Sequence, residues 1–223
     1  RLHNCYLHGS NQTNLIGRYR NTYTYCKSEG ASWRGFGYNT GSCAYGCSAM
    51  DNGLEGWNIT STENWVINCI SHGNTSHGIE LNGYQAHVFN CTVDGNGGSG
   101  VFQDAGSSSL VVARSIISNN GAYGIRTDSS SSIVMSFDNH FHNNTSGNLE
   151  GTMPDGGSTT GDPLFVDLTQ VDVANDHRIK PGSPASFLQF GSPFVADSWG
   201  AKGAIQTRRP VIYHPGMSGG ARG

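Results

Sequence analysis

The stretch Asn68-Cys69-Ile70-Ser71-His72-Gly73-Asn74 returns 22 residues later as Asn90-Cys91-Thr92-Val93-Asp94-Gly95-Asn96. Both copies begin with Asn-Cys and end with Gly-Asn, which indicates an internal repeat. The cysteine position recurs every 21–24 residues through residues 1–150, at Cys5, Cys26, Cys47, Ser115 and Asn139 as well as in the two copies. One column of seven equivalent positions therefore runs along the chain.

Three further columns keep the same period. Asparagine stands five residues after the cysteine column, glycine nine after it and an apolar residue ten after it. The asparagines are Asn52, Asn74, Asn96, Asn120 and Asn144, the glycines are Gly35, Gly56, Gly78, Gly100 and Gly124, and the apolar residues include Phe36, Trp57, Ile79, Val101 and Ile125. Columns that share one period predict stacked copies of one structural unit.

The repeat predicts an all-β fold. No window shows a helical 3.6-residue stripe with caps, and the leucine-rich pattern of other repeats of this length is absent. We expect a right-handed parallel β-helix of about seven coils, each with three short strands and stacked about 4.8 Å apart. The cysteine column should face inward as free thiols, because parallel stacking aligns the Cβ vectors poorly for disulfides. The asparagines should form a hydrogen-bonded ladder at a corner.

The two quoted stretches resemble the pectate-lyase-like right-handed parallel β-helix repeat, over residues 1–150. This resemblance implies the fold but no activity, because the fold carries many functions. Asp162–Asp167 (DPLFVD) and Pro181–Ala185 (PGSPA) resemble the closing segment of bacterial surface or phage-type β-helix proteins. We therefore expect an irregular C-terminal cap over residues 151–206 and a Gly-rich tail over 207–223. The repeat is in register from Asn4-Cys5, so we expect a piece of a longer protein.

Composition excludes several classes of protein. Only 13% of the residues are charged and the net charge is −3, which argues against a nucleic-acid partner. No apolar stretch approaches the roughly 20 residues of a membrane span. No Cys/His spacing suits zinc, so we expect no metal and no cofactor, although Ca²⁺ stays possible because of the weak run Asp94–Gly98.

Outward residues eleven and thirteen positions after the cysteine column should share one strand face. The catalytic candidates there are Glu80, Asp104, Arg126 and Asp128, and the ligand-binding candidates are Phe102 and Asn82. Two carboxylates about 5–9 Å apart can hydrolyse a glycosidic bond. Carboxylates with an arginine can also support a calcium-assisted β-elimination, and Phe102 can stack on a sugar ring. The alternative is an ordinary polar strand surface.

A rival site is the pair His72 and Asp94, three residues after the cysteine column on neighbouring coils. A histidine base and its orienting carboxylate would have this arrangement. The alternative is an incidental ion pair in a solvated polar row.

The function expected from these observations is that of an extracellular β-helix protein, secreted or on a cell surface or virion, which binds carbohydrate without catalysis or is structural. The alternative is a polysaccharide lyase or glycoside hydrolase that acts on an acidic polysaccharide. Neither the calcium cluster of pectate lyases nor the paired aspartates of polygalacturonases is found. The expected partner is a polysaccharide or glycan. The sequence also leaves open that the chain forms a homo-oligomer or is part of a larger assembly.

Overall fold

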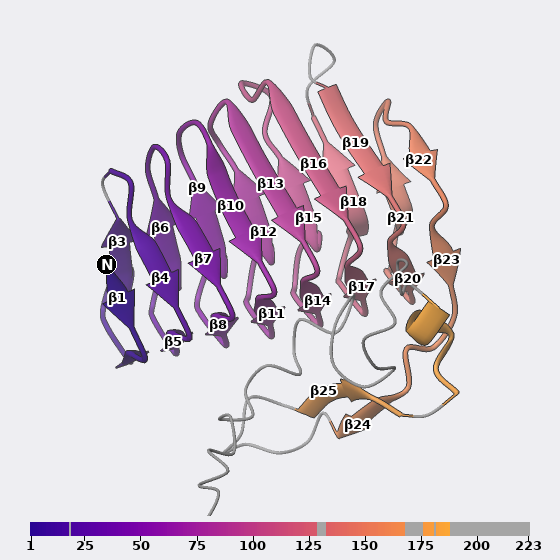
Figure 1. Ribbon diagram of the computed structural model, residues 1–223, viewed down its shortest axis with the longest axis horizontal. Helices are drawn as coiled ribbons and strands as arrows, with labels where there is room; N and C mark the ends of the chain where they lie inside the picture. Colours follow the sequence, from indigo (N-terminus) through magenta and orange to yellow (C-terminus); the bar gives the residue numbers. More distant parts are fainter. Residues whose placement is uncertain (18, 129–132, 168–175, 181, 188–223) are drawn as a thin grey trace, which may run out of the picture.

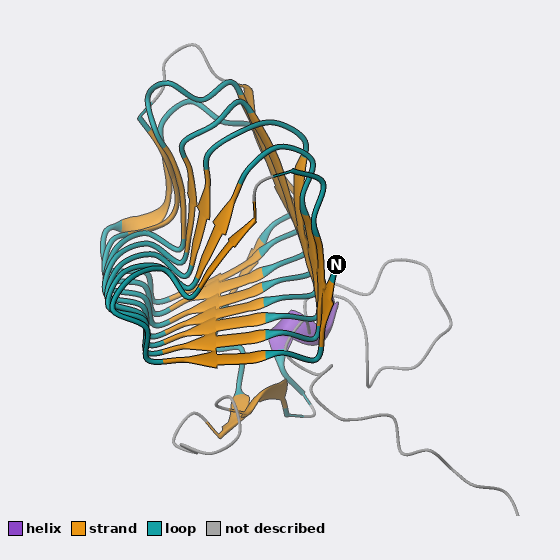
Figure 2. Cartoon of the chain, turned by 90° about the vertical axis from the view of Figure 1, so that its left-hand side faces the viewer, coloured by secondary structure: helices purple, strands orange, loops and turns teal. Residues whose placement is uncertain are grey.

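The chain forms a solenoid of parallel β-strands, seen in a computed structural model that describes residues 1–17, 19–128, 133–167, 176–180 and 182–187. Seven coils contribute three strands each, so that seen along its axis the solenoid has three sides (Figure 2). We name the three sheets A, B and C in the order in which each coil visits them. The predicted all-β fold, with seven coils and three strands per coil, is confirmed.

Sheet A holds the first strand of each coil (Figure 1). Its strands are β1 (Leu2–His3), β4 (Thr22–Thr24), β7 (Cys43–Tyr45), β10 (Asn64–Ile67), β13 (Gln85–Phe89), β16 (Ser109–Ala113), β19 (Ile133–Phe137) and β22 (Asp155–Gly156). The strands lengthen from two residues at β1 to five at β13, β16 and β19, so the solenoid widens along its axis.

Sheets B and C complete each coil. Sheet B contains β2 (Tyr6–His8), β5 (Lys27–Glu29), β8 (Ser48–Met50), β11 (Ile70–His72), β14 (Thr92–Asp94), β17 (Ile116–Ser118), β20 (His140–His142) and β23 (Thr159–Thr160). Sheet C contains β3 (Leu15–Gly17), β6 (Phe36–Tyr38), β9 (Trp57–Ile59), β12 (Ile79–Leu81), β15 (Val101–Gln103), β18 (Tyr123–Thr127) and β21 (Gly147–Glu150). All pairings within the three sheets are parallel and follow the register of the repeat, for example Ser71 with Val93.

The corner between sheets A and B explains the recurring Asn-Cys. The residue before the cysteine column adopts a left-handed conformation, with φ of 54° at Asn68 and 53° at Asn90. Asparagine tolerates this conformation better than most residues, because its side chain can hydrogen-bond locally. The turn sends the following cysteine inward, where Cys69 and Cys91 are each 1% exposed.

The predicted cysteine column lines the interior. All six cysteines are free, in line with a ladder of thiols. Burial raises the pKa of Cys91 to about 12, so this thiol stays protonated and is no nucleophile at neutral pH. Two residues further on, Val93 and Ile117 also point inward and are fully buried, as the alternation of side chains along a strand predicts.

The predicted asparagine ladder is confirmed at the corner between sheets B and C. The side-chain amide of each rung donates to the amide oxygen of the next. The Nδ2–Oδ1 distances are 2.8 Å for Asn52–Asn74, 2.9 Å for Asn74–Asn96, 3.0 Å for Asn96–Asn120 and 2.8 Å for Asn120–Asn144. The glycine column lies against this ladder: a Cβ on Gly78 would stand 2.8 Å from Nδ2 of Asn96 and 2.7 Å from the carbonyl oxygen of Gly100.

The segment after residue 150 first continues the solenoid and then leaves it. Strands β22 and β23 extend sheets A and B by part of an eighth coil. An antiparallel pair, β24 (Phe165–Asp167) and β25 (Asp176–Ile179), then lies outside sheet B, followed by the 3-10 helix η1 (Pro184–Phe187) (Figures 1 and 2). Phe165 and Ala185 pack on Ile116 of sheet B, so this segment covers a side of the solenoid. The tail predicted over 207–223 lies outside the described residues.

Candidate functional site

The outer face of sheet C brings the predicted ionisable residues together. The strand register places Glu80 beside Asn58 and Phe102, Phe102 beside Arg126, and Arg126 beside Glu150. These five side chains form one outward row that crosses five successive coils. The row exists because each member stands eleven residues after the cysteine column.

Glu80 lies at the centre of the most unusual electrostatic environment on this face. The pKa of the Glu80 carboxyl is raised to about 7, chiefly by burial and also by repulsion from the neighbouring Glu55 carboxyl and a hydrogen bond shared with it. Asn82 and Asn58 oppose the shift by hydrogen-bonding Glu80, with Nδ2 of Asn58 donating over 3.1 Å. Glu80 is therefore poised to exchange a proton near neutral pH.

Glu55 comes from the turn that precedes β9, and the sequence analysis missed it. Its side chain is 8% exposed and forms an ion pair with Arg34, with 2.8 Å between Oε2 and Nε. The ion pair with Arg34 holds the Glu55 carboxyl in place beside Glu80. The signal was present in the sequence, since Arg34, Glu55 and His77 all stand eight residues after the cysteine column.

His77 lies against the same cluster in its neutral form. Burial lowers the pKa of the imidazole, and its Nδ1 accepts a hydrogen bond from the backbone N–H of Ser99 over 2.9 Å. An accepting Nδ1 leaves the ring proton on Nε2, so His77 offers a donor there. The ring also stacks on Phe102, with 4.4 Å between centroids.

Phe102 and Arg126 are held in place by their neighbours. The Phe102 ring is 8% exposed, with His77 stacked on it and the Arg126 guanidinium 5.4 Å from its centroid. In this conformation Phe102 supports the site by packing and offers no open ring to a sugar, contrary to our expectation. Arg126 pairs with Asp128 at 2.8 Å and with Glu150 at 3.0 Å, so its charge is already balanced.

The remaining candidate, Asp104, follows β15 and is exposed to solvent. Its Oδ1 accepts the backbone N–H of Ala105 over 2.8 Å, which orients the carboxylate at the strand end. Asp104 stands one coil further along than Asn82 and Glu80, which is a separation of about 5 Å along the axis. Glu80 and Asp104 thus flank the same stretch of surface.

The rival pair on sheet B is also brought together, but in a different environment. Nδ1 of His72 lies 3.2 Å from Oδ2 of Asp94. Asp94 is 1% exposed, and its Oδ1 accepts hydrogen bonds from Ser118 Oγ at 2.6 Å and Asn119 Nδ2 at 2.8 Å. A buried carboxylate with this set of donors is a satisfied structural anion, and the predicted base of this pair is His72, which Asp94 orients through Nδ1.

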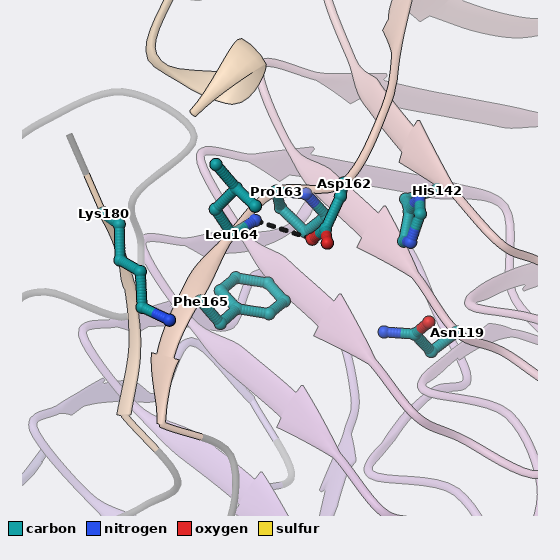
Figure 3. Close-up of a pocket in the computed structure, with 7 residues that line it drawn as sticks. All are labelled: Asn119, His142, Asp162, Pro163, Leu164, Phe165 and Lys180. Atoms are coloured by element: carbon teal, nitrogen blue, oxygen red, sulfur yellow. Dashed lines mark hydrogen bonds between the residues drawn. The ribbon is translucent and has the colours of Figure 1, made fainter. Parts of the chain in front are cut away.

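A small cavity of about 270 Å³ lies beside that pair, between sheet B and the C-terminal segment (Figure 3). Its lining includes His142 and Asn119 from the solenoid and Asp162, Phe165 and Lys180 from the segment. Asn119 is already hydrogen-bonded to Asp94 and Asn143. Across the described ranges, no three His, Cys, Asp or Glu residues are grouped to hold a metal ion, and no helix is long and apolar enough to cross a membrane.

Fold and repeat together define a solenoid of right-handed parallel coils with ionisable rows on its outer faces. Residues 3–153 match the family described as right handed beta helix region, and the chain belongs to that family. A comparison with curated proteins finds no match.

Two solved structures share the fold. The mannuronan C-5 epimerase AlgE6 A-module of Azotobacter vinelandii is 15% identical, with a TM-score of 0.55 over 72% of this chain and 57% of that chain. The periplasmic alginate epimerase AlgG is also 15% identical, with a TM-score of 0.55 over 69% of this chain and 44% of that chain. The chain thus spans about half the length of these structures, and the likeness shows the fold.

Proposed function

We propose that this protein is a glycan-active enzyme whose acid–base centre is the carboxyl pair Glu55–Glu80 on sheet C. The observation that carries the proposal is the Glu80 carboxyl, with a pKa of about 7, next to the ion-paired Glu55. Perturbed carboxyl pairs of this kind are typical of sites that move protons. Both solved structures of similar fold are named as epimerases of mannuronan or alginate, which supports a polysaccharide as the ligand.

The charges on this face favour hydrolysis of an uncharged glycan. Among the residues that the structure describes, the guanidiniums near the carboxyls of Glu55, Glu80, Asp104, Asp128 and Glu150 are those of Arg34 and Arg126. Both guanidiniums already pair with carboxylates. A polyuronate would meet net negative charge here, and no unpaired guanidinium of this cluster could receive its carboxylates.

The reaction can be written with these residues. Glu80 donates its proton to the glycosidic oxygen as the bond to the anomeric carbon breaks. A water molecule adds to that carbon and loses its proton to Asp104. Asp104 lies one coil along the axis and two residues along the strand from Glu80, which separates their backbone positions by about 8 Å. This separation falls in the range of about 6.5–9.5 Å used by the carboxyl pairs of inverting glycosidases. Glu55, which Arg34 holds in place, favours the protonated form of Glu80 by repulsion and by a shared hydrogen bond, and Asn82 and Asn58 orient the Glu80 carboxyl.

A second candidate is a non-catalytic glycan-binding protein, outside the cell. The network of Arg126 with Asp128, Glu150 and Phe102 favours it, because such a network holds polar groups in fixed positions for sugar hydroxyls. We propose an extracellular or periplasmic location for both candidate functions. Assistance by Ca²⁺ is also a proposal, and the described residues contain no group of three His, Cys, Asp or Glu residues that could hold the ion.

The test is a panel of neutral and acidic polysaccharides that includes alginate. New reducing ends report hydrolysis, ultraviolet absorbance of unsaturated uronate ends reports elimination, and calorimetry reports binding. We expect reducing ends from a neutral glycan, with turnover lowered about 10²–10⁴-fold in Glu80→Gln. The matched control is Asp138→Asn, a carboxylate on a corner between sheets A and B, which should turn over normally.

Other outcomes discriminate among the alternatives. Unsaturated ends from an acidic polysaccharide would replace the hydrolase by a lyase. Binding without any product would favour the non-catalytic protein. Equal activity of Glu80→Gln and wild type would show that the Glu55–Glu80 pair does not take part in the reaction.

A further inference from the structure

The outer face of sheet A differs from the other two faces in having no formal charge over its first seven strands. Strands β1, β4, β7, β10, β13, β16 and β19 contain no Asp, Glu, Lys or Arg. The eighth strand, β22 in the partial last coil, contains Asp155, which accepts a hydrogen bond from Ser136 Oγ. Sheet B carries Lys27, Glu29 and Asp94 in its strands, and sheet C carries Glu80, Arg126 and Glu150. A face of seven strands without a charge is unusual for a surface that meets only water.

The face includes large apolar side chains that are exposed, together with uncharged polar residues such as Thr22, Gln85 and Ser109. Ile133 is 61% exposed, Met135 is 44% exposed and Trp65 is 39% exposed. Burial lowers the pKa of His87, so this ring is neutral at pH 7. No described strand or helix lies over β7, β10, β13 and β16 on this side (Figure 1). The apolar surface is therefore open over the described part of the chain.

Charged residues do occur at the border of the face. Glu63 directly precedes β10, Arg114 directly follows β16, and Asp138 directly follows β19. An apolar centre with a polar border is the usual anatomy of a protein–protein interface.

The size of the face agrees with this interpretation. Seven strands spaced about 4.8 Å apart run about 30 Å along the axis, and strands of three to five residues are about 10–17 Å wide. The flat area is about 300–500 Å² per copy, before the relief of side chains and the border is added. Open apolar patches of this size mark interaction sites, and with its border the face approaches the low end of specific interfaces.

We infer that the outer face of sheet A is the contact surface between two copies of this chain, related by a two-fold axis. In such an isologous contact every group meets a copy of the same patch. Only groups near the two-fold axis meet their own copies, and charged groups elsewhere in the contact would have to be desolvated and paired. The uncharged strands of sheet A carry no such cost, whereas the strands of sheets B and C contain charged residues such as Lys27, Glu29 and Arg126.

A second copy fits this face better than a sugar chain does. The rings of Trp65 and His87 are stacked 4.1 Å apart at 20°, and the Phe89 ring lies nearly parallel to both. Their π-faces are turned toward one another along the axis, so they present edges outward. Sugar rings bind over open aromatic faces, while ring edges and aliphatic side chains suit packing against a similar surface.

The test measures mass in solution by analytical ultracentrifugation over a series of protein concentrations. The full chain should approach twice the monomer mass as concentration rises. The double variant Ile133→Glu/Met135→Glu should raise the dissociation constant at least 10-fold, because each copy would then bury two charges at an uncharged contact. Both side chains are exposed, so the fold should survive, which circular dichroism and a thermal melt can verify.

The matched control is Ile16→Glu, an isoleucine with 66% exposure on sheet C, which should associate as the wild type does. A wild type that stays monomeric at every concentration overturns the inference, and so does a double variant that dimerises normally. The face would be assigned to glycan instead if the wild type stays monomeric and is retained on an immobilised neutral polysaccharide, while the double variant is not retained.

Discussion

Two pairs of ionisable side chains join neighbouring coils of this solenoid, and they differ in what surrounds them. On sheet B, Asp94 is buried among Ser118, Asn119 and His72, all of which donate hydrogen bonds to it or lie within reach to do so. On sheet C, Glu80 lies beside a second carboxyl, Glu55, and its pKa rises to about 7. The same coil spacing produces a satisfied structural anion in one case and a proton-exchanging group in the other.

The difference shows that proximity alone does not make a site. Donors around a carboxylate stabilise its charged form, whereas burial and a neighbouring negative charge destabilise that form. The sequence predicts both pairs from the same period, but only the surroundings of each pair distinguish their roles. Substitutions in the two pairs should therefore have opposite consequences for stability.

The largest difference is expected for removal of the two carboxyls. Asp94→Ala should lower the free energy of unfolding by about 2–4 kcal/mol, because it leaves buried donors of Ser118 and Asn119 without their acceptor. Glu80→Gln should leave the stability at pH 8 unchanged or higher, because Gln can still donate to Glu55. Urea denaturation measures both. Equal losses in the two variants would contradict the distinction.

A smaller effect is expected in the pH dependence of stability. The pKa of Glu80 is about 7 in the fold against 4.5 as the ordinary value. The stabilising contribution of the protonated carboxyl is complete below about pH 4.5 and is lost as the pH rises through about 7. The free energy of unfolding of the wild type should therefore fall by about 1–2 kcal/mol relative to that of Glu80→Gln across this range. This value is smaller than the full pKa difference would give, because Glu80 is partly exposed to solvent.

The measurement is a series of urea denaturation curves between pH 4 and 8, with Asp138→Asn as the control carboxyl. Parallel curves for wild type and Glu80→Gln would mean that Glu80 titrates at its ordinary pKa. That result would also remove the main support for the acid–base centre.

The smallest effect is expected for His72→Ala. Asp94 keeps Ser118 and Asn119 as donors, so the loss in unfolding free energy should be below about 1 kcal/mol. Turnover of any glycan should not change. A loss of turnover in this variant, with Glu80→Gln unaffected, would place the proposed active site on sheet B instead of sheet C.

The sequence alone determined the coil and its stacking. The spacing of Cys69 and Cys91 set the period, and Asn74 and Asn96 predicted the ladder that the structure contains. The rows of Glu80, Phe102 and Arg126 also followed from the same count. Such features depend only on the register between neighbouring coils, and the recurring positions of a repeat determine that register.

Only the tertiary structure decided which outward residues carry chemistry. Glu55 stands in a turn, and its approach to Glu80 depends on the path of the backbone between sheets B and C. Phe102 seemed an open ring by its alternation, yet His77 and Arg126 pack on it. Asp94 seemed a surface carboxylate, yet it is 1% exposed. Burial and pKa depend on every neighbour of a group in space, and the repeat predicts the neighbours along each row but not how closely two different rows approach one another.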